Sequence, residues 1–149
     1  MTSRIDTRTT SPTARRGGYV VSVVVNLVLL YVINVGPGWQ RLPFLTDDFA
    51  DVLVIVNLSM LATLLVNVVQ IFYDPPWFVA LGQLVLSAIA LVVAVRLLEV
   101  WPFDFSGYSF NWDALTRVML WIAVVGSIAG MIASVVQVAR STVMTPLER

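Results

Sequence analysis

The sequence contains no cysteine, no histidine and no lysine. Without cysteine there is no disulfide, no thiol nucleophile and no thiolate metal site. Without histidine there is no imidazole base, and the commonest zinc and haem ligand is missing. Without lysine there is neither a Schiff-base amine nor a P-loop lysine for phosphates. A few carboxylates, hydroxyls and arginines remain for chemistry, so the composition argues against an enzyme and against a bound cofactor.

Charge is also scarce in this chain. Only 12% of the 149 residues are charged, nine basic residues balance nine acidic ones, and 58% of the residues are hydrophobic. That apolar fraction is well above the globular average and indicates membrane-spanning segments. A net charge of zero gives no indication of nucleic-acid binding.

The apolar residues fall into four long stretches. Residues 52–73 and 118–139 carry no charged side chain, and each run is long enough to cross the roughly 30 Å hydrocarbon core as a helix. Segments rich in proline and glycine at 36–38 and 74–76 separate these runs from their neighbours. The sequence therefore predicts an all-α fold, an integral membrane four-helix bundle, with spans at about 18–36, 48–73, 76–100 and 112–139.

The two ends of the chain predict its orientation. Residues 1–16 are polar and rich in Thr, Ser and Arg, so we expect a disordered basic tail before the bundle of residues 17–140. Residues 141–149 form a second short tail. Arginines concentrate at both ends, whereas most acidic residues follow the first and third spans. The positive-inside rule then predicts a multi-pass protein of the plasma membrane with both termini cytoplasmic.

The second and fourth spans resemble each other. At an offset of 67 residues, small and polar residues spaced 4, 4 and 3 apart coincide, and this spacing follows one helix face. The sequence predicts two tandem similar helical hairpins that pack through this stripe, because small residues let helices approach and amides hydrogen-bond across them. A polar path between the hairpins is the alternative. The stripe comprises Ser59, Thr63, Asn67 and Gln70 in one span and Gly126, Gly130, Ser134 and Gln137 in the other.

Ionisable side chains near the end of the third span form a second candidate site. Charged groups inside a membrane are costly and often functional. Arg96 and Glu99 are three residues apart and can pair on one helix, and Glu99 is also placed to reach Arg117 or Asn34 on neighbouring spans. These four residues make up a candidate intramembrane polar site. The structural alternative is that Arg96 extends its side chain to the headgroup layer.

The segments around the predicted helix starts carry acids and aromatic rings. Asp47, Asp48 and Asp51 would suit a hard cation, but acids are also expected at a helix N-terminus on dipole grounds, and we expect no metal there. Thr46 and Asn111 are candidate N-caps. The loop at 101–113 is dense in Trp, Phe and Tyr, which is typical of an interfacial belt. A site for a lipid, a quinone or a partner helix is the alternative.

Three segments of the chain support a resemblance. FLTDDF, YDPPW and WPFDFSGYSF resemble those of small, uncharacterised four-span membrane proteins from actinobacteria. The resemblance covers most of the chain after the tail and implies a four-span membrane fold. It implies no activity, no cofactor and no functional residue.

Taken together, these features predict a non-enzymatic multi-pass membrane protein. We expect an accessory or scaffold subunit that acts through helix–helix packing in the lipid bilayer, as a homo-oligomer or within a larger membrane complex. The alternative is a subunit of an oligomeric small-solute or ion channel or transporter, supported by the intramembrane charges and amides. Four spans leave little room for a pore within one chain, so that alternative requires assembly.

Overall fold

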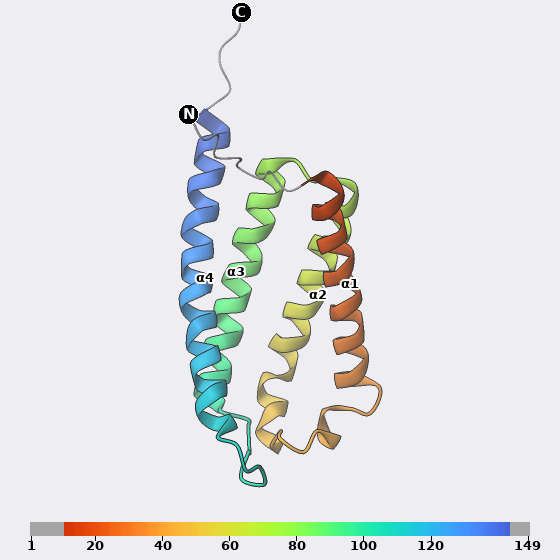
Figure 1. Cartoon of the computed structure of the whole chain (residues 1–149), viewed down its shortest axis with the longest axis vertical. Helices are drawn as coiled ribbons and strands as arrows, with labels where there is room; N and C mark the ends of the chain where they lie inside the picture. Colours follow the sequence, from red (N-terminus) through yellow and green to blue (C-terminus); the bar gives the residue numbers. More distant parts are fainter. Residues whose placement is uncertain (1–10, 144–149) are drawn as a thin grey trace, which may run out of the picture.

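A computed structural model describes residues 11–143 of the chain (Figure 1). Two short 3-10 helices lie in the connection between the first two long helices, η1 (Trp39–Arg41) and η2 (Asp47–Phe49). The described residues contain no β-strand beyond one isolated bridge, which confirms the all-α prediction. The four long helices are α1 (Pro12–Asn34), α2 (Ala50–Phe72), α3 (Pro76–Val100) and α4 (Trp112–Val143).

The surface of this bundle is apolar. All four helices are long and hydrophobic enough to cross a membrane. Large apolar side chains are exposed along every helix, whereas the buried positions include polar residues such as Asn67, Gln70 and Ser134. In water such a surface would be unfavourable, but lipid tails solvate it. The chain is thus a multi-pass membrane protein.

The observed helix bounds differ from the predicted spans mainly at the two ends. α1 begins at Pro12, so residues 12–16 are helical rather than part of a disordered tail. The start is fixed by Ser11, whose hydroxyl accepts a hydrogen bond from the Ala14 N–H at 3.3 Å, and by a proline in the first turn. α4 continues beyond residue 139 to Val143. Residues 1–10 and 144–149, the rest of the predicted tails, lie outside the described residues.

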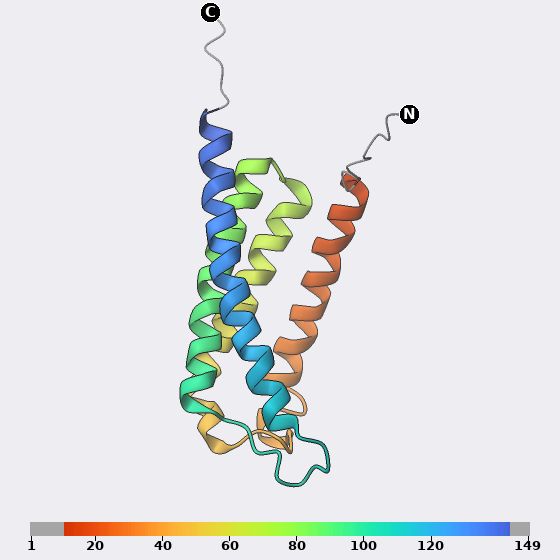
Figure 2. The ribbon, with the colours of Figure 1, turned by 60° about the vertical axis from the view of Figure 1, so that its left-hand side comes forward.

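The helices alternate in direction, so α1 begins and α4 ends at the same end of the bundle (Figure 1). We call this the terminal end, and the opposite end, formed by the α1–α2 and α3–α4 connections, the loop end. The most extensive interface joins α3 to α4, followed by α1 with α2 and then α2 with α3. Within the described part of the chain, α1 and α4 share no extensive interface, and they diverge toward the terminal end (Figure 2).

The apolar core lies near the loop end. Phe49, Val52 and Val56 are buried there, and Val52 is fully inaccessible. Residues from the α1–α2 connection and from α3 pack around them, including Trp39, whose ring centroid lies 5.6 Å from that of Phe49. This core therefore anchors the loop-end connections to the helices.

Two glycines let α3 approach its neighbours. A Cβ at Gly82 would lie 2.9 Å from both Gln70 Nε2 and Val66 Cγ1 of α2. A Cβ at Gly130 of α4 would lie 2.8 Å from the Ser87 hydroxyl oxygen of α3. Small residues at such points allow backbones to approach closely, which is the main source of helix association in membranes.

Candidate functional site

The polar stripe of α2 is partly to fully covered by neighbouring helices, and most of its side chains hydrogen-bond within their own helix. The hydroxyls of Ser59 and Thr63 donate to the carbonyls of Val56 and Ser59 at 2.7 and 2.8 Å, and Asn67 Nδ2 donates to the Thr63 carbonyl at 2.7 Å. Asn67 and Gln70 are buried. This arrangement favours the packing interpretation over a polar path, because the donors are already used within the helix.

The predicted counterpart on α4 does not form one packing surface. Ser134 is buried and Gly130 approaches Ser87 of α3. Gly126 and Gln137, in contrast, are exposed, and no heavy atom lies within 4 Å of a Cβ placed at Gly126. Within this one chain, therefore, two of the four positions of the predicted stripe on α4 are exposed. The buried residues of α4 include Ser127 instead.

The four residues of the candidate intramembrane polar site lie in three separate pairs. Arg96 pairs with Glu99 at 3.1 Å, as their spacing on one helix predicts. Arg117 does not reach Glu99 but pairs with Asp113 of its own helix, with Nε 3.2 Å from Oδ2. Asn34 does not reach Glu99 either. The structure thus offers no joint site for these four side chains.

The Arg96–Glu99 pair lies at the surface of α3. The side chains are 47% and 56% exposed, and α3 ends one residue after Glu99. Two opposite charges one helical turn apart neutralise each other, and their nearness to the helix end lets both reach the headgroup layer. This geometry supports the structural interpretation of the pair.

Asn34 forms a reciprocal amide pair with Asn57 of α2. Asn34 Nδ2 donates to Asn57 Oδ1 at 2.9 Å, and Asn57 Nδ2 donates back to Asn34 Oδ1 at 2.7 Å. Asn34 also donates to the Leu30 carbonyl at 2.9 Å. The pair lies at the wall of an open groove of about 610 Å³ between α1 and α2, lined otherwise by apolar residues and Tyr31. It therefore links α1 to α2 at the surface of the bundle.

A cavity of about 230 Å³ lies between α2, α3 and α4. Its lining is apolar except for Ser59 and Thr63, whose hydroxyls already donate to backbone carbonyls. No charged residue lines it. Such a cavity does not suit the passage of an ion, because nothing in its wall would replace the hydration shell.

The two connections at the loop end are joined by backbone hydrogen bonds. Leu45 and Phe103 form an isolated antiparallel bridge. The Thr46 N–H donates to the Pro102 carbonyl at 3.1 Å, and the Asp104 N–H donates to the Phe44 carbonyl at 3.0 Å. We call this the loop bridge. It brings Phe44 beside the aromatic loop, a neighbour that sequence spacing did not indicate.

Aromatic rings from both connections gather beside the loop bridge. The Phe105 ring lies parallel to those of Phe44 and Phe103, with centroids 6.3 and 5.8 Å away, and Tyr108 meets it edge-on at 6.3 Å. With Trp112 and Thr116 of α4, these residues line a cavity of about 370 Å³. We call it the aromatic cavity. The rings therefore line a common space that is open to one side.

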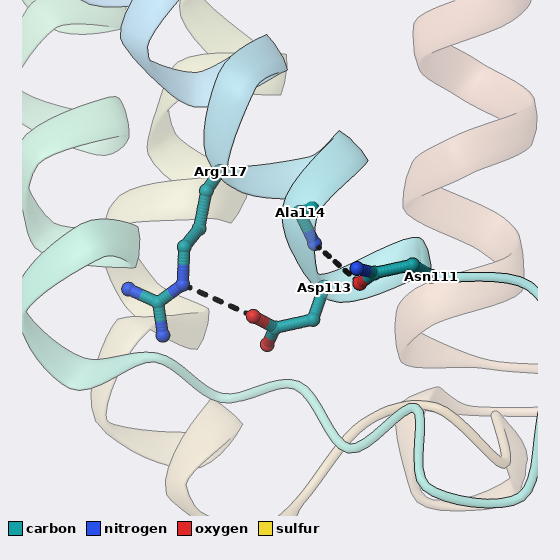
Figure 3. A network of polar contacts seen from close by, with 4 residues as sticks. All are labelled: Asn111, Asp113, Ala114 and Arg117. Atoms are coloured by element: carbon teal, nitrogen blue, oxygen red, sulfur yellow. Dashed lines mark hydrogen bonds and ion pairs between the residues drawn. The ribbon is translucent and has the colours of Figure 1, made fainter.

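The start of α4 is organised by local polar contacts (Figure 3). Asn111 caps the helix, as predicted, because its Oδ1 accepts from the Ala114 N–H at 3.1 Å. Arg117 points toward Asp113 in the same view. The Arg117 guanidinium carbon also lies 3.8 Å from the centroid of the Trp101 ring, a cation–π contact.

Trp101 itself adopts an unusual backbone conformation. It ends α3 with φ +47°, in the left-handed region that favours glycine. The ring packs against Phe103 at 5.4 Å as well as beneath Arg117. These two contacts stabilise a tryptophan where the backbone alone would favour glycine.

The acidic residues of the loop end are mostly exposed. Asp104 Oδ1 accepts from the Ser106 N–H at 2.9 Å. This bond and the Ser106 hydroxyl hold the pKa of the Asp104 carboxyl below its usual value, so the side chain is charged at neutral pH. Thr46 stands at the N-cap position before η2, but its hydroxyl caps no backbone N–H and instead donates to the Asp48 carboxylate at 3.4 Å. Between residues 11 and 143, no three acidic side chains are grouped to hold a metal ion.

At the terminal end, one ion pair joins α1 to the α2–α3 connection. Arg15 Nη2 lies 3.1 Å from Asp74 Oδ2, without the alignment of a hydrogen bond. The Asp74 side chain is only 20% exposed. Arg15 was expected in a disordered tail, so sequence reasoning missed this contact.

Searches of protein-family models, curated proteins and solved structures find no match to this chain. Its function is therefore inferred from the geometry of its own residues.

Proposed function

We propose that this chain is a non-enzymatic assembly subunit, which binds other transmembrane helices through the free faces of α1 and α4. The observation that carries the proposal is the open bundle. α1 packs chiefly on α2 and contains no buried residue. α4 packs chiefly on α3. A chain that leaves both its outermost helices half-uncovered has two surfaces on which further helices fit.

The outward face of α4 supports this proposal. Gly126, Ala129 and Ala133 recur at spacings of 3 and 4, and all three are exposed. Larger apolar residues flank them, including Ile122 and Ile132. Small side chains gain little from contact with lipid tails, but a groove between larger ones lets a second helix approach closely. A second copy of the chain presents the same face, so two copies can pack against each other without another kind of chain. A second copy is therefore the simplest partner.

The proposed setting is the plasma membrane with both termini in the cytoplasm. The Arg residues at the two ends of the chain support that orientation through the positive-inside rule. The acids of the loop end would then lie outside.

The alternative of a channel or transporter subunit has weaker support. The Arg96–Glu99 pair is neutralised at the surface, and the cavity among α2, α3 and α4 has no charged lining. Any conducting path would have to lie between copies of the chain.

Two glycines one turn apart on α4 provide the test. Gly126→Leu should not lower the helical content or the free energy of unfolding of the single chain, because the position faces open space. It should nevertheless abolish the complex that native mass spectrometry detects after extraction in a mild detergent. The matched variant Gly130→Leu should lower stability instead, since its side chain would meet Ser87 of α3.

Two results would contradict the proposal. One is a wild-type protein that is monomeric and free of any partner in its own membrane extract. The other is a Gly126→Leu protein that keeps the wild-type complex.

A further inference from the structure

The aromatic cavity has the composition of a cation site. Its lining consists of Phe44, Phe103, Phe105, Tyr108, Trp112 and Thr116. Aromatic rings carry negative charge on their faces, and several rings around one space form the cage that proteins use for quaternary ammonium groups. The volume of about 370 Å³ lies within the roughly 300–1,000 Å³ of small-molecule sites.

The cage is held in place by the backbone. The loop bridge fixes Phe44 relative to Phe103 through hydrogen bonds of 3.0 and 3.1 Å on either side. The Tyr108 N–H donates to the Phe105 carbonyl at 3.0 Å, which sets the turn between these two rings. Trp112 stands on the first turn of α4. Rings positioned in this way lose little freedom when a ligand enters, which favours affinity.

The charges around the aromatic cavity favour a cation. A second cavity of about 400 Å³ shares four of its aromatic residues and adds Asp104 and Asp113 to the wall. The loop end as a whole carries six acidic residues and three arginines. The acids are Asp47, Asp48, Asp51, Glu99, Asp104 and Asp113, and the basic residues are Arg41, Arg96 and Arg117.

The positive charge of Arg117 does not line the aromatic cavity. Its guanidinium lies over Trp101, outside the lining of the aromatic cavity, and is paired with Asp113. Asp104 has no basic partner among the ion pairs of the described residues and is charged at neutral pH. A cation in the aromatic cavity would therefore lie among several aromatic rings, with a carboxylate nearby.

We propose that the aromatic cavity binds a quaternary ammonium group, carried either by a free organic cation such as choline or by the choline headgroup of a lipid. The methyl groups of such a cation fill an apolar space without requiring hydrogen bonds. Its charge is stabilised by the rings and by the carboxylates at the rim. A hydrated metal ion or a primary amine would need oxygen ligands that the apolar lining does not provide.

The first test compares choline with its neutral carbon isostere, 3,3-dimethylbutan-1-ol. The purified protein is placed in a maltoside detergent, which has no ammonium group, and binding is followed by isothermal titration calorimetry. We expect saturable binding of choline and at least tenfold weaker binding of the isostere. Equal binding of the two compounds, or no saturable binding of choline, would overturn the proposal.

Variants locate the site. Trp112→Leu should weaken choline binding roughly 2- to 30-fold, the range expected for one cation–π contact. Asp104→Asn should weaken it less. Trp77→Leu is the matched control, because Trp77 belongs to an aromatic cluster with Tyr73 and Phe78 at the terminal end. Elution and circular dichroism identify any variant that misfolds, and the isostere comparison on the wild-type protein does not depend on the variants.

A change in binding that is the same for Trp112→Leu and Trp77→Leu would refute the assignment to this cavity.

The source of the ligand follows from a last comparison in lipid nanodiscs. Choline that binds equally well in phosphatidylglycerol and in phosphatidylcholine identifies a free cation as the ligand. Choline that binds only in phosphatidylglycerol shows that the lipid headgroup occupies the cage.

Discussion

The close contact between α2 and α3 at Gly82 predicts that one added methyl group at this position destabilises the protein. Gly82→Ala would place a Cβ 2.9 Å from Val66 Cγ1 and from Gln70 Nε2. The Gln70 amide is the end of a flexible side chain and can move. Val66 cannot adjust in the same way, because a β-branched residue in a helix is restricted to one χ1 rotamer. The two helices must therefore separate locally.

The expected cost follows from two opposing terms. Overpacking of this kind costs about 1–3 kcal/mol. Replacing glycine by alanine inside a helix gains roughly 1 kcal/mol of helix propensity. Gly18→Ala in α1 has the same gain but no clash, since nothing lies within 4 Å of its Cβ. The difference between the two variants removes the propensity term, so Gly82→Ala should be about 1–3 kcal/mol less stable than Gly18→Ala.

The assay is reversible unfolding by sodium dodecyl sulfate in mixed micelles, followed by far-ultraviolet circular dichroism. Both variants and the wild-type protein are measured under identical lipid and detergent conditions. Free energies of unfolding for Gly82→Ala and Gly18→Ala that agree within about 0.5 kcal/mol, the range of ordinary surface changes, would refute the close approach of α2 and α3 at this point.

Two further predictions concern the α1–α2 pair and the orientation. Asn34→Leu and Asn57→Leu should each lower the free energy of unfolding by about 0.6–2 kcal/mol. The double variant should lose less than the sum of the two single losses, because either change already breaks both amide hydrogen bonds. Strict additivity would argue against the pair. For the orientation, single cysteines can be introduced because the chain has no cysteine of its own. Ser106→Cys should react with a membrane-impermeant maleimide on intact cells, whereas Ser11→Cys should react only after permeabilisation. The opposite pattern would reverse the proposed orientation.

The fold was largely predictable because hydropathy acts over long runs of residues. Charge-free stretches and turn-forming segments predicted four helices, and the structure has α3 at the expected residues 76–100. Local patterns also sufficed for Asn111 as a cap and for the Arg96–Glu99 ion pair, since both depend on spacing along one helix. The start of α1 was misjudged because Arg15 and Arg16 lower the hydropathy of its first turns, although Ser11 and Pro12 favour a helix there.

The contacts between segments were not predictable in the same way. Asn34 and Asn57 meet only because α1 and α2 pack in one register, and apolar helices of similar composition carry little information about register. The same limitation explains Gly126, which the repeat alignment placed in a packing stripe and which the structure leaves exposed. Phe44 joins the aromatic cavity through the loop bridge, a pairing of two connections that no periodic pattern encodes.

The loop bridge also has a consequence for the order in which the molecule is completed during synthesis. Once α1 and α2 have emerged, they can insert as a hairpin and form the Asn34–Asn57 pair. The bridge has to wait for residues 102–104, and the aromatic cavity for the first turns of α4. The cavity is therefore the last part of the loop end to exist, and a ligand held there would bind only chains whose two hairpins have already met.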